Sequence, residues 1–84
     1  MKFSEALERC IGGAKITRRD WNGKGMFVYY VGPSVVYAEN WAPWKSDTAV
    51  EVRGHFDMLC ADGTVCVGWL ATQTDMASDR WEEV

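Results

Sequence analysis

The segment Met26–Val31 constrains the fold most, because its side chains are apolar or aromatic on both faces of the strand that it predicts. A sheet with one wet face needs only one apolar face, with polar residues on the other. A chain of 84 residues buries only about 60–65% of its unfolded surface and has little material to cover two faces. We therefore expect a partner subunit, a ligand, or both to cover the second face.

The first element is predicted to be a helix that covers the other face. Apolar residues recur at spacings of three and four over residues 3–11, which is typical of a helix that buries one side. We expect Ser4 to cap its start and Gly12–Gly13 to end it in a left-handed turn.

Two dipeptides predict tight turns between strands. Asn22–Gly23 and Asp62–Gly63 are strong hairpin signals, because these residue types tolerate positive φ angles. Residues 72–78 are expected to form a loop that enters a single helical turn. We expect strands at residues 15–19, 26–31, 56–60, 64–69 and 81–84.

Residues 32–54 have the least readable pattern. Only Val35–Tyr37 forms an apolar run, so we expect a loop with at most one strand or helical turn. Trp41 and Trp44 are expected to pack on the sheet edge or on a neighbouring subunit. The whole pattern predicts a single α+β domain over residues 1–84, with an N-terminal helix packed on an antiparallel sheet of about four or five strands.

The net charge of −3 is distributed unevenly. Residues 1–25 hold six basic and three acidic residues, whereas residues 26–84 hold three basic and nine acidic ones. An acidic protein is repelled by a polyanion, so we expect no binding to duplex nucleic acid. No stretch approaches the roughly 20 apolar residues that span a bilayer, so we expect no membrane partner and a cytoplasmic protein.

The three cysteines are expected to be free thiols in a reducing cytoplasm. They form no pair with the spacing of a zinc site or a redox motif. Cys60 and Cys66 flank the second predicted turn, and they face each other across the hairpin only if that turn has an odd number of residues.

The sequence shows no catalytic or metal-binding constellation. His55 is the single histidine, and no nucleophile lies at a recognisable spacing from it. There is no cluster of metal-ligand type and no glycine-rich phosphate loop of the Lys-Ser/Thr kind. We therefore expect no catalytic residues, no metal and no cofactor.

Two tryptophans open short polar segments, Trp21–Phe27 and Trp69–Met76. A nucleotide-sized ligand needs a flat apolar surface for stacking, beside hydrogen-bonding groups and a cation for phosphate. Gly25 permits close approach of the backbone to such a ligand. In the competing interpretation each Trp fills the core, and Thr72 or Thr74 only caps a helical turn.

These segments, with two others, resemble a known family of small phage and bacterial proteins. The resembling motifs are Phe3–Leu7, Arg18–Met26, Met58–Gly63 and Trp69–Met76. The family includes the second class of Thoeris anti-defence proteins. The resemblance implies a non-enzymatic sponge that captures cyclic ADP-ribose signals, and in some members cyclic oligonucleotides, in pockets shared between the subunits of a homotetramer. It also implies action in the cytoplasm of the infected bacterial host.

The resemblance also implies which residues bind the ligand. Trp21 and Trp69 would provide stacking walls, with Phe27 and Tyr29 near them. The polar edges of the ligand would be read by Asn22, Gly25, Thr72, Gln73, Thr74 and Asp75. Phosphate would be met by Arg18, Arg19 or Lys24. The chain departs from the family pattern at Arg80, where an acidic residue is expected, and in residues 33–54.

Several alternatives remain open from the sequence. The main one is a structural or interaction module that forms a homo-oligomer without a small-molecule ligand. Another is an enzyme that degrades the nucleotide, which the missing catalytic groups disfavour. The residues do not distinguish a dimer from a tetramer, nor one cyclic nucleotide from another.

Overall fold

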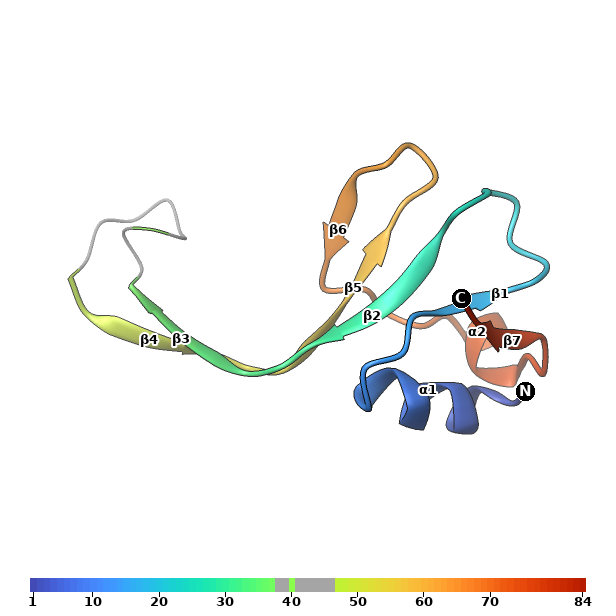
Figure 1. Cartoon of the computed structure of the whole chain (residues 1–84), viewed down its shortest axis with the longest axis horizontal. Helices are drawn as coiled ribbons and strands as arrows, with labels where there is room; N and C mark the ends of the chain where they lie inside the picture. The colour runs from blue at the N-terminus through green and yellow to red at the C-terminus, as the bar shows by residue number, and fades with distance from the viewer. Residues whose placement is uncertain (38–39, 41–46) are drawn as a thin grey trace.

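The computed structural model describes residues 1–37, 40 and 47–84. Its main body is a five-stranded antiparallel sheet in the order β6-β5-β2-β1-β7, with helix α1 packed against it (Figure 1). A second sheet of two strands, β3 and β4, stands apart from the body as an arm. The elements are α1 (Phe3–Ile11), β1 (Ile16–Arg18), β2 (Phe27–Val31), β3 (Ser34–Tyr37), β4 (Ala49–Val52), β5 (His55–Leu59), β6 (Val65–Val67), α2 (Gln73–Ala77) and β7 (Trp81–Glu83). The predicted α+β class is confirmed.

Helix α1 is amphipathic as predicted, but it starts differently. Lys2 precedes its first residue in an extended conformation, and no side chain caps this end. The prediction that Ser4 is the cap is wrong, because Ser4 lies inside the first turn, where its own N–H is one of the helix's unpaired donors. At the other end Gly13 takes a φ of 111°, so the predicted glycine turn is present.

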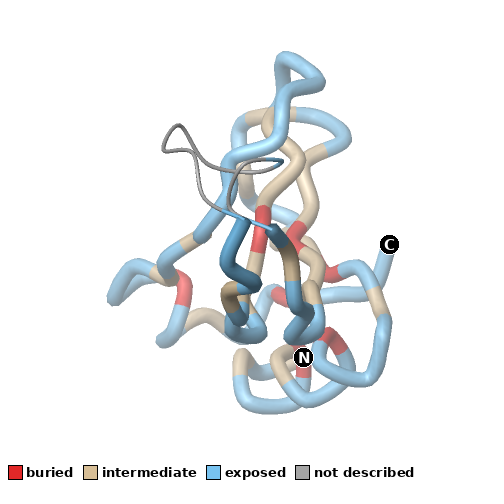
Figure 2. Tube along the Cα trace, turned by 90° about the vertical axis from the view of Figure 1, so that its left-hand side faces the viewer, coloured by how far each residue is buried: buried red, intermediate tan, exposed pale blue. Residues whose placement is uncertain are grey.

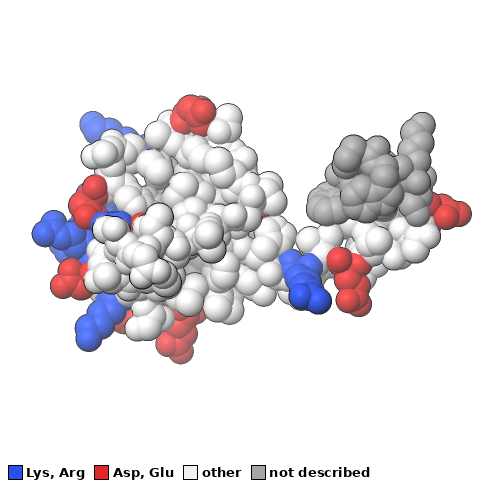
Figure 3. Space-filling model, turned by 180° about the vertical axis from the view of Figure 1, so that it is seen from behind, with Lys and Arg blue, Asp and Glu red and all other residues white. Residues whose placement is uncertain are grey.

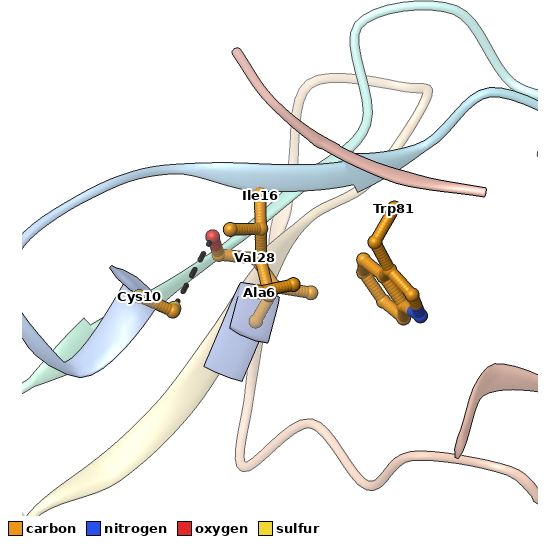
Figure 4. Packing of buried hydrophobic residues seen from close by; sticks show 5 residues of the cluster. All are labelled: Ala6, Cys10, Ile16, Val28 and Trp81. Atoms are coloured by element: carbon orange, nitrogen blue, oxygen red, sulfur yellow. Dashed lines mark hydrogen bonds between the residues drawn. The ribbon is translucent and has the colours of Figure 1, made fainter. Parts of the chain in front are cut away.

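The core lies between α1 and the helix-side face of the sheet. Ala6 and Cys10 of α1 are fully buried against Ile16 of β1 and Val28 of β2, and Trp81 of β7 completes the cluster (Figure 4). Small side chains at the two helix positions let α1 lie close to the strands. The Cys10 thiol also donates to the Val28 carbonyl at 3.8 Å, and burial raises the pKa of this thiol.

The other face of the sheet, here called the open face, has no such helix packed on it among the residues that the structure describes. The register pairs Tyr29 with Asp57 and Asp57 with Val67, which places these three side chains on the face away from Val28. Val65 and Val67 are 48% and 73% exposed. The second apolar face predicted from β2 therefore exists, and its apolar surface is partly open to solvent.

The connection from β1 to β2 is not the tight turn that was predicted. It spans residues 19–26, and within it only Gly25 has a positive φ, of 77°. Gly23 serves a different purpose: a Cβ on it would lie 2.7 Å from the Cβ of Ala61 and would also clash with Met26. Gly23 is thus needed for the close approach of this loop to the turn of the β5–β6 hairpin, and not for turn conformation.

Gly23→Ala is expected to lower the free energy of unfolding by about 1–3 kcal/mol, because the added methyl group overfills a packed contact. Denaturant titration followed by tryptophan fluorescence measures the change. Gly32→Ala is the matched control, since a Cβ at Gly32 meets nothing within 4 Å and its φ is not positive. Equal stability of the two variants would contradict this role of Gly23.

The arm corrects the prediction for residues 32–54, which expected at most one strand. β3 and β4 pair antiparallel, with Val36 opposite Val50. Pro33 lies just before β3, where a missing N–H removes no bond from the ladder. The arm carries no buried residue among those described (Figure 2). It is joined to the body by a narrow neck (Figure 3). Trp41 and Trp44 lie outside the described residues, so their packing stays a prediction.

The C-terminal half follows the predictions closely. β5 and β6 form the expected hairpin, with Leu59 opposite Val65 and a φ of 86° at Gly63. The single helical turn is α2, and the last strand, β7, pairs with β1 at the sheet edge. The chain thus brings its last strand next to its first strand and under the N-terminal helix.

Candidate functional site

Trp81 is the structural centre of the candidate site. It is 1% exposed, and its indole N–H donates to the Asp75 carbonyl at 2.8 Å. Its ring meets Trp21 and Trp69 edge to face, with centroids 5.3 and 6.1 Å away, and Phe3 at 5.4 Å. Such aromatic pairs are worth about 0.5–1.5 kcal/mol each beyond the area they bury. Trp81 therefore joins both Trp-led segments to α1.

Trp21 and Trp69 are brought together by these contacts, although 48 positions separate them in the chain. Both pack against the core cluster, so the interpretation in which they fill the core holds in part. Both are also only half-buried, which leaves part of each indole accessible. Their role as stacking walls stays a prediction.

Asp75 is held by partners from both Trp-led segments. Its carboxylate accepts from Arg18 at 2.8 Å, from the Trp21 indole at 3.4 Å and from the Thr72 N–H at 2.9 Å. The Asp75 N–H in turn donates to the Thr72 hydroxyl at 3.1 Å, which completes a capping box at the start of α2. The interpretation in which Thr72 caps the turn is confirmed, and Asp75 is 5% exposed.

Arg18 joins β1 to this network. Its guanidinium forms two bonds to Asp20, at 3.1 and 2.7 Å, besides the bond to Asp75. The Arg18 side chain is 9% exposed. Two carboxylates therefore already compensate the positive charge at the place where a phosphate contact was expected.

The other predicted cations differ in their surroundings. Arg19 is 62% exposed and lies 3.9 Å from Glu82, whereas Lys24 is exposed and has no ion pair within the described part of the chain. Acidic and basic side chains alternate over the end of the body away from the arm (Figure 3). The three arginines of the basic N-terminal segment are thus each paired with an acidic residue from the C-terminal part of the chain.

The ionisation of Asp75 couples the network to pH. Burial opposes the charged form, but the hydrogen bonds from Thr72, Arg18 and Trp21 outweigh it and lower the pKa of Asp75 from 3.8. Since the folded pKa is the lower one, Asp75 contributes stability in full above pH 3.8 and loses it as the pH falls through the folded value.

We expect the free energy of unfolding to decrease between about pH 5 and pH 2, as acid titrates the paired carboxylates. Denaturant midpoints measured across this range test the expectation. Asp75→Asn removes this titration, so its midpoint should change less with pH than that of the wild-type chain. Equal slopes for the two proteins would mean that Asp75 does not contribute.

An open hollow lies beside this network, with a volume of about 480 Å³. It is lined by Arg18, Asp20, Gln73, Thr74, Ala77, Ser78, Asp79 and Arg80. Small-molecule sites commonly occupy about 300–1,000 Å³. The hollow gathers three of the predicted ligand residues and adds Ser78 and Arg80. Neither was predicted to bind ligand, because the segment between α2 and β7 carries no recognisable motif.

The remaining predicted residues lie elsewhere. Asn22, Lys24 and Gly25 are exposed in the β1–β2 loop and are not among the residues that line the hollow. Phe27 and Tyr29 are on the open face, with ring centroids 6.0 Å apart. The single chain therefore divides the predicted site between the hollow, the tryptophans around Trp81, the β1–β2 loop and the open face.

Metal-ion clusters and membrane-spanning helices are both absent from the part of the chain that the structure describes. Among them, no three His, Cys, Asp or Glu side chains are grouped to hold a metal ion. In residues 1–37, 40 and 47–84, no helix has the length and apolar character that crossing a membrane requires.

Comparison with known proteins gives the family. The sequence model of the family named Thoeris anti-defense 2-like domain matches residues 1–84. The chain is similar to the protein Thoeris anti-defense 2 of Bacillus phage SP01, with 26% identity over 84 residues that cover 100% of this chain and 94% of that protein. Because the domain match extends over the whole sequence, the chain belongs to the Thoeris anti-defense 2-like family.

Proposed function

We propose that this protein is a phage anti-defence protein that binds and sequesters a cyclic nucleotide immune signal without cleaving it. Its membership in the Thoeris anti-defense 2-like family supports the anti-defence role. The proposed signals are cyclic ADP-ribose isomers and, as a second possibility within the same class, cyclic oligonucleotides. Such a protein acts in the cytoplasm of the infected bacterial host.

The observation that carries the ligand proposal is that two half-buried tryptophans meet on Trp81, and that Trp21 shares Asp75 with Arg18, which lines a polar hollow. The accessible part of each half-buried indole offers a stacking surface for a base, and such stacking is worth about 1–3 kcal/mol. The amide of Gln73 and the hydroxyl of Thr74 line the hollow and are exposed. They supply donors and acceptors for ribose hydroxyls and base edges. Arg80, at the same hollow, supplies a cation for phosphate.

Capture without cleavage is supported by the groups at the hollow. None of its described lining residues is a histidine or a cysteine. The bonds from Arg18 lower the pKa of Asp20, which keeps this carboxyl ionised and makes it a poor proton donor at neutral pH. The lining residues are therefore suited to hydrogen bonding and charge compensation.

Self-association is the second part of the proposal. The open face presents Val65 and Val67 together with half-buried Phe27 and Tyr29, and a small domain gains stability by covering such a surface. We propose a homo-oligomer, with a tetramer as its form. A shared pocket would then let residues of the open face or the β1–β2 loop complete the site of another subunit.

One experiment tests binding and fate of the ligand together. The purified protein is mixed with cyclic ADP-ribose isomers and cyclic di- and trinucleotides, separated from unbound ligand and denatured by heat. Mass spectrometry then identifies what is released. Intact ligand is the expected result, whereas altered ligand would indicate an enzyme. If none of these compounds is retained, the alternative of a structural or interaction module without a ligand would be favoured. The exposed Val65 and Val67 are consistent with that alternative.

The proposed role of the hollow is tested by truncating two of its lining residues. Replacing both Gln73 and Thr74 with alanine is expected to weaken retention about 30-fold, because two hydrogen bonds of about 1 kcal/mol each are lost. Equilibrium dialysis measures the affinity, and light scattering checks that the oligomer persists. Ser34→Ala, on the exposed part of β3, is the control. Unchanged affinity in the double variant would exclude the hollow as the ligand site.

A further inference from the structure

Two thiols lie in contact on the β5–β6 hairpin. The Sγ atoms of Cys60 and Cys66 are 2.8 Å apart, and both cysteines are free. Cys66 is exposed and Cys60 is half-buried. The hairpin register explains the contact: the Cys60 N–H donates to the Thr64 carbonyl at 2.8 Å, and Cys66 follows two residues later on the same face. The turn between Cys60 and Thr64 has three residues. This is an odd number, which is the condition for the two cysteines to face each other across the hairpin.

We propose that Cys60 and Cys66 are a thiol–disulfide exchange site, which forms a reversible intramolecular disulfide with a small-molecule disulfide as the oxidant. The exposed Cys66 thiolate attacks one sulfur of the oxidant, forms a mixed disulfide and releases the first small thiol. The Cys60 thiolate then attacks the Cys66 sulfur and expels the second small thiol. The protein loses two electrons and two protons, and the oxidant takes up both.

The neighbourhood of the pair supports this order of events. The hydrogen bond to Cys60 raises the pKa of Cys66, so Cys66 must lose a proton before it attacks. Cys10, the third cysteine, is buried in the core and donates to Val28. Exposure selects Cys66 for the first attack, and contact selects Cys60 for the second.

The disulfide would link the edge strand β6 covalently to β5. All three residues of β6 are exposed, so hairpin hydrogen bonds rather than buried side chains hold the strand. β6 continues through Gly68, whose N–H donates to Asp57 at 3.0 Å, into Trp69, whose N–H donates to Phe56 at 2.7 Å. A covalent link between β5 and β6 therefore limits fraying next to the segment that positions Trp69.

Treatment of the full chain with oxidised glutathione tests the proposal. Intact-mass spectrometry under denaturing, non-reducing conditions should show a loss of about 2 Da, the two hydrogens released by the disulfide. Peptide mapping should link Cys60 to Cys66 and leave Cys10 open to alkylation. Dithiothreitol should restore the original mass. Amide exchange of residues 65–67 should slow about tenfold in the oxidised protein.

Two single variants serve as controls. Cys66→Ser and Cys60→Ser change side chains outside the core, and circular dichroism verifies that each is folded. Each should gain the mass of one glutathione at its remaining hairpin cysteine, because no neighbouring thiol displaces it. Stable glutathione adducts on both hairpin cysteines of the wild-type chain, a disulfide between two chains, or no reaction would each overturn the proposal.

Discussion

Replacing Trp81 with alanine is expected to lower the free energy of unfolding by about 4 kcal/mol, the largest stability effect that we predict for a single side chain. Trp81 is 1% exposed and contacts the rings of Phe3, Trp21 and Trp69. Its loss leaves a cavity among these rings and removes the indole donor from the Asp75 carbonyl. For a domain of this size the loss approaches the whole stability.

Denaturant titration monitored by circular dichroism measures this effect without relying on indole fluorescence. Trp81→Phe is the first comparison: it keeps an aromatic ring, loses the bond to the Asp75 carbonyl, and should be destabilised less than the alanine variant. Leu70→Ala is the second, because Leu70 is 86% exposed and its truncation should cost under about 0.5 kcal/mol. A similar cost for Trp81→Ala and Leu70→Ala would show that the aromatic cluster does not support the fold.

Asp75→Ala is expected to be destabilised by about 3 kcal/mol, because it leaves the positive charge of Arg18 buried with one partner fewer. It also removes one half of the capping box on Thr72 and the acceptor for the Trp21 indole. Stability and ligand retention should therefore fall together. A joint loss of stability and ligand retention is expected for a residue that positions the site. A residue that only contacts the ligand would lose retention without losing stability.

Three variants make this comparison specific. Thermal unfolding and ligand retention are measured for Asp75→Ala, for Arg18→Ala and for Asp79→Ala, the last at an exposed position of the same hollow. The first two should be destabilised similarly, and Asp79→Ala should unfold like the wild-type chain. If Asp75→Ala lost retention at unchanged stability, direct contact with the ligand would be the better account of Asp75.

The expected effects differ in kind between Asp75 and the pair Gln73 and Thr74. Gln73 and Thr74 are exposed at the hollow, so truncating them should remove the proposed ligand bonds and little of the fold. Asp75 holds Arg18 and Trp21, so its truncation disturbs both. The proposed function is thus tested most directly on the exposed residues, because their loss leaves the scaffold intact.

Local patterns predicted the elements whose stability depends on neighbours in sequence. The apolar spacing in residues 3–11 determines a helix that buries Ala6 and Cys10. Asp62–Gly63 determines a hairpin, since Gly63 adopts the positive φ that its turn requires. Thr72 determines the start of α2, because its hydroxyl accepts a hydrogen bond from the backbone N–H of Asp75, three positions later.

The wrong predictions arose where distant contacts override a local preference. Asn22–Gly23 is a strong turn signal, but Gly23 is used for contact with Ala61, which lies in another hairpin. The arm was missed because its strands, β3 and β4, bury no residue in the body, so no apolar alternation toward the core marks them. Ser4 was expected to cap α1, yet the helix begins one residue earlier.

The sequence by itself determined the helix, the two-faced strand at Met26–Val31, the β5–β6 hairpin and a family resemblance carried by two Trp-led segments. Only the tertiary structure decided that both segments meet on Trp81 and that Arg18 pairs with Asp75, 57 positions away. The physical reason is that a helix or turn depends on backbone bonds between near neighbours, whereas the partner of a buried charge depends on how the whole chain packs. The residues first predicted as ligand contacts therefore lie in several places: at the hollow, in the network around Asp75, in the β1–β2 loop and on the open face.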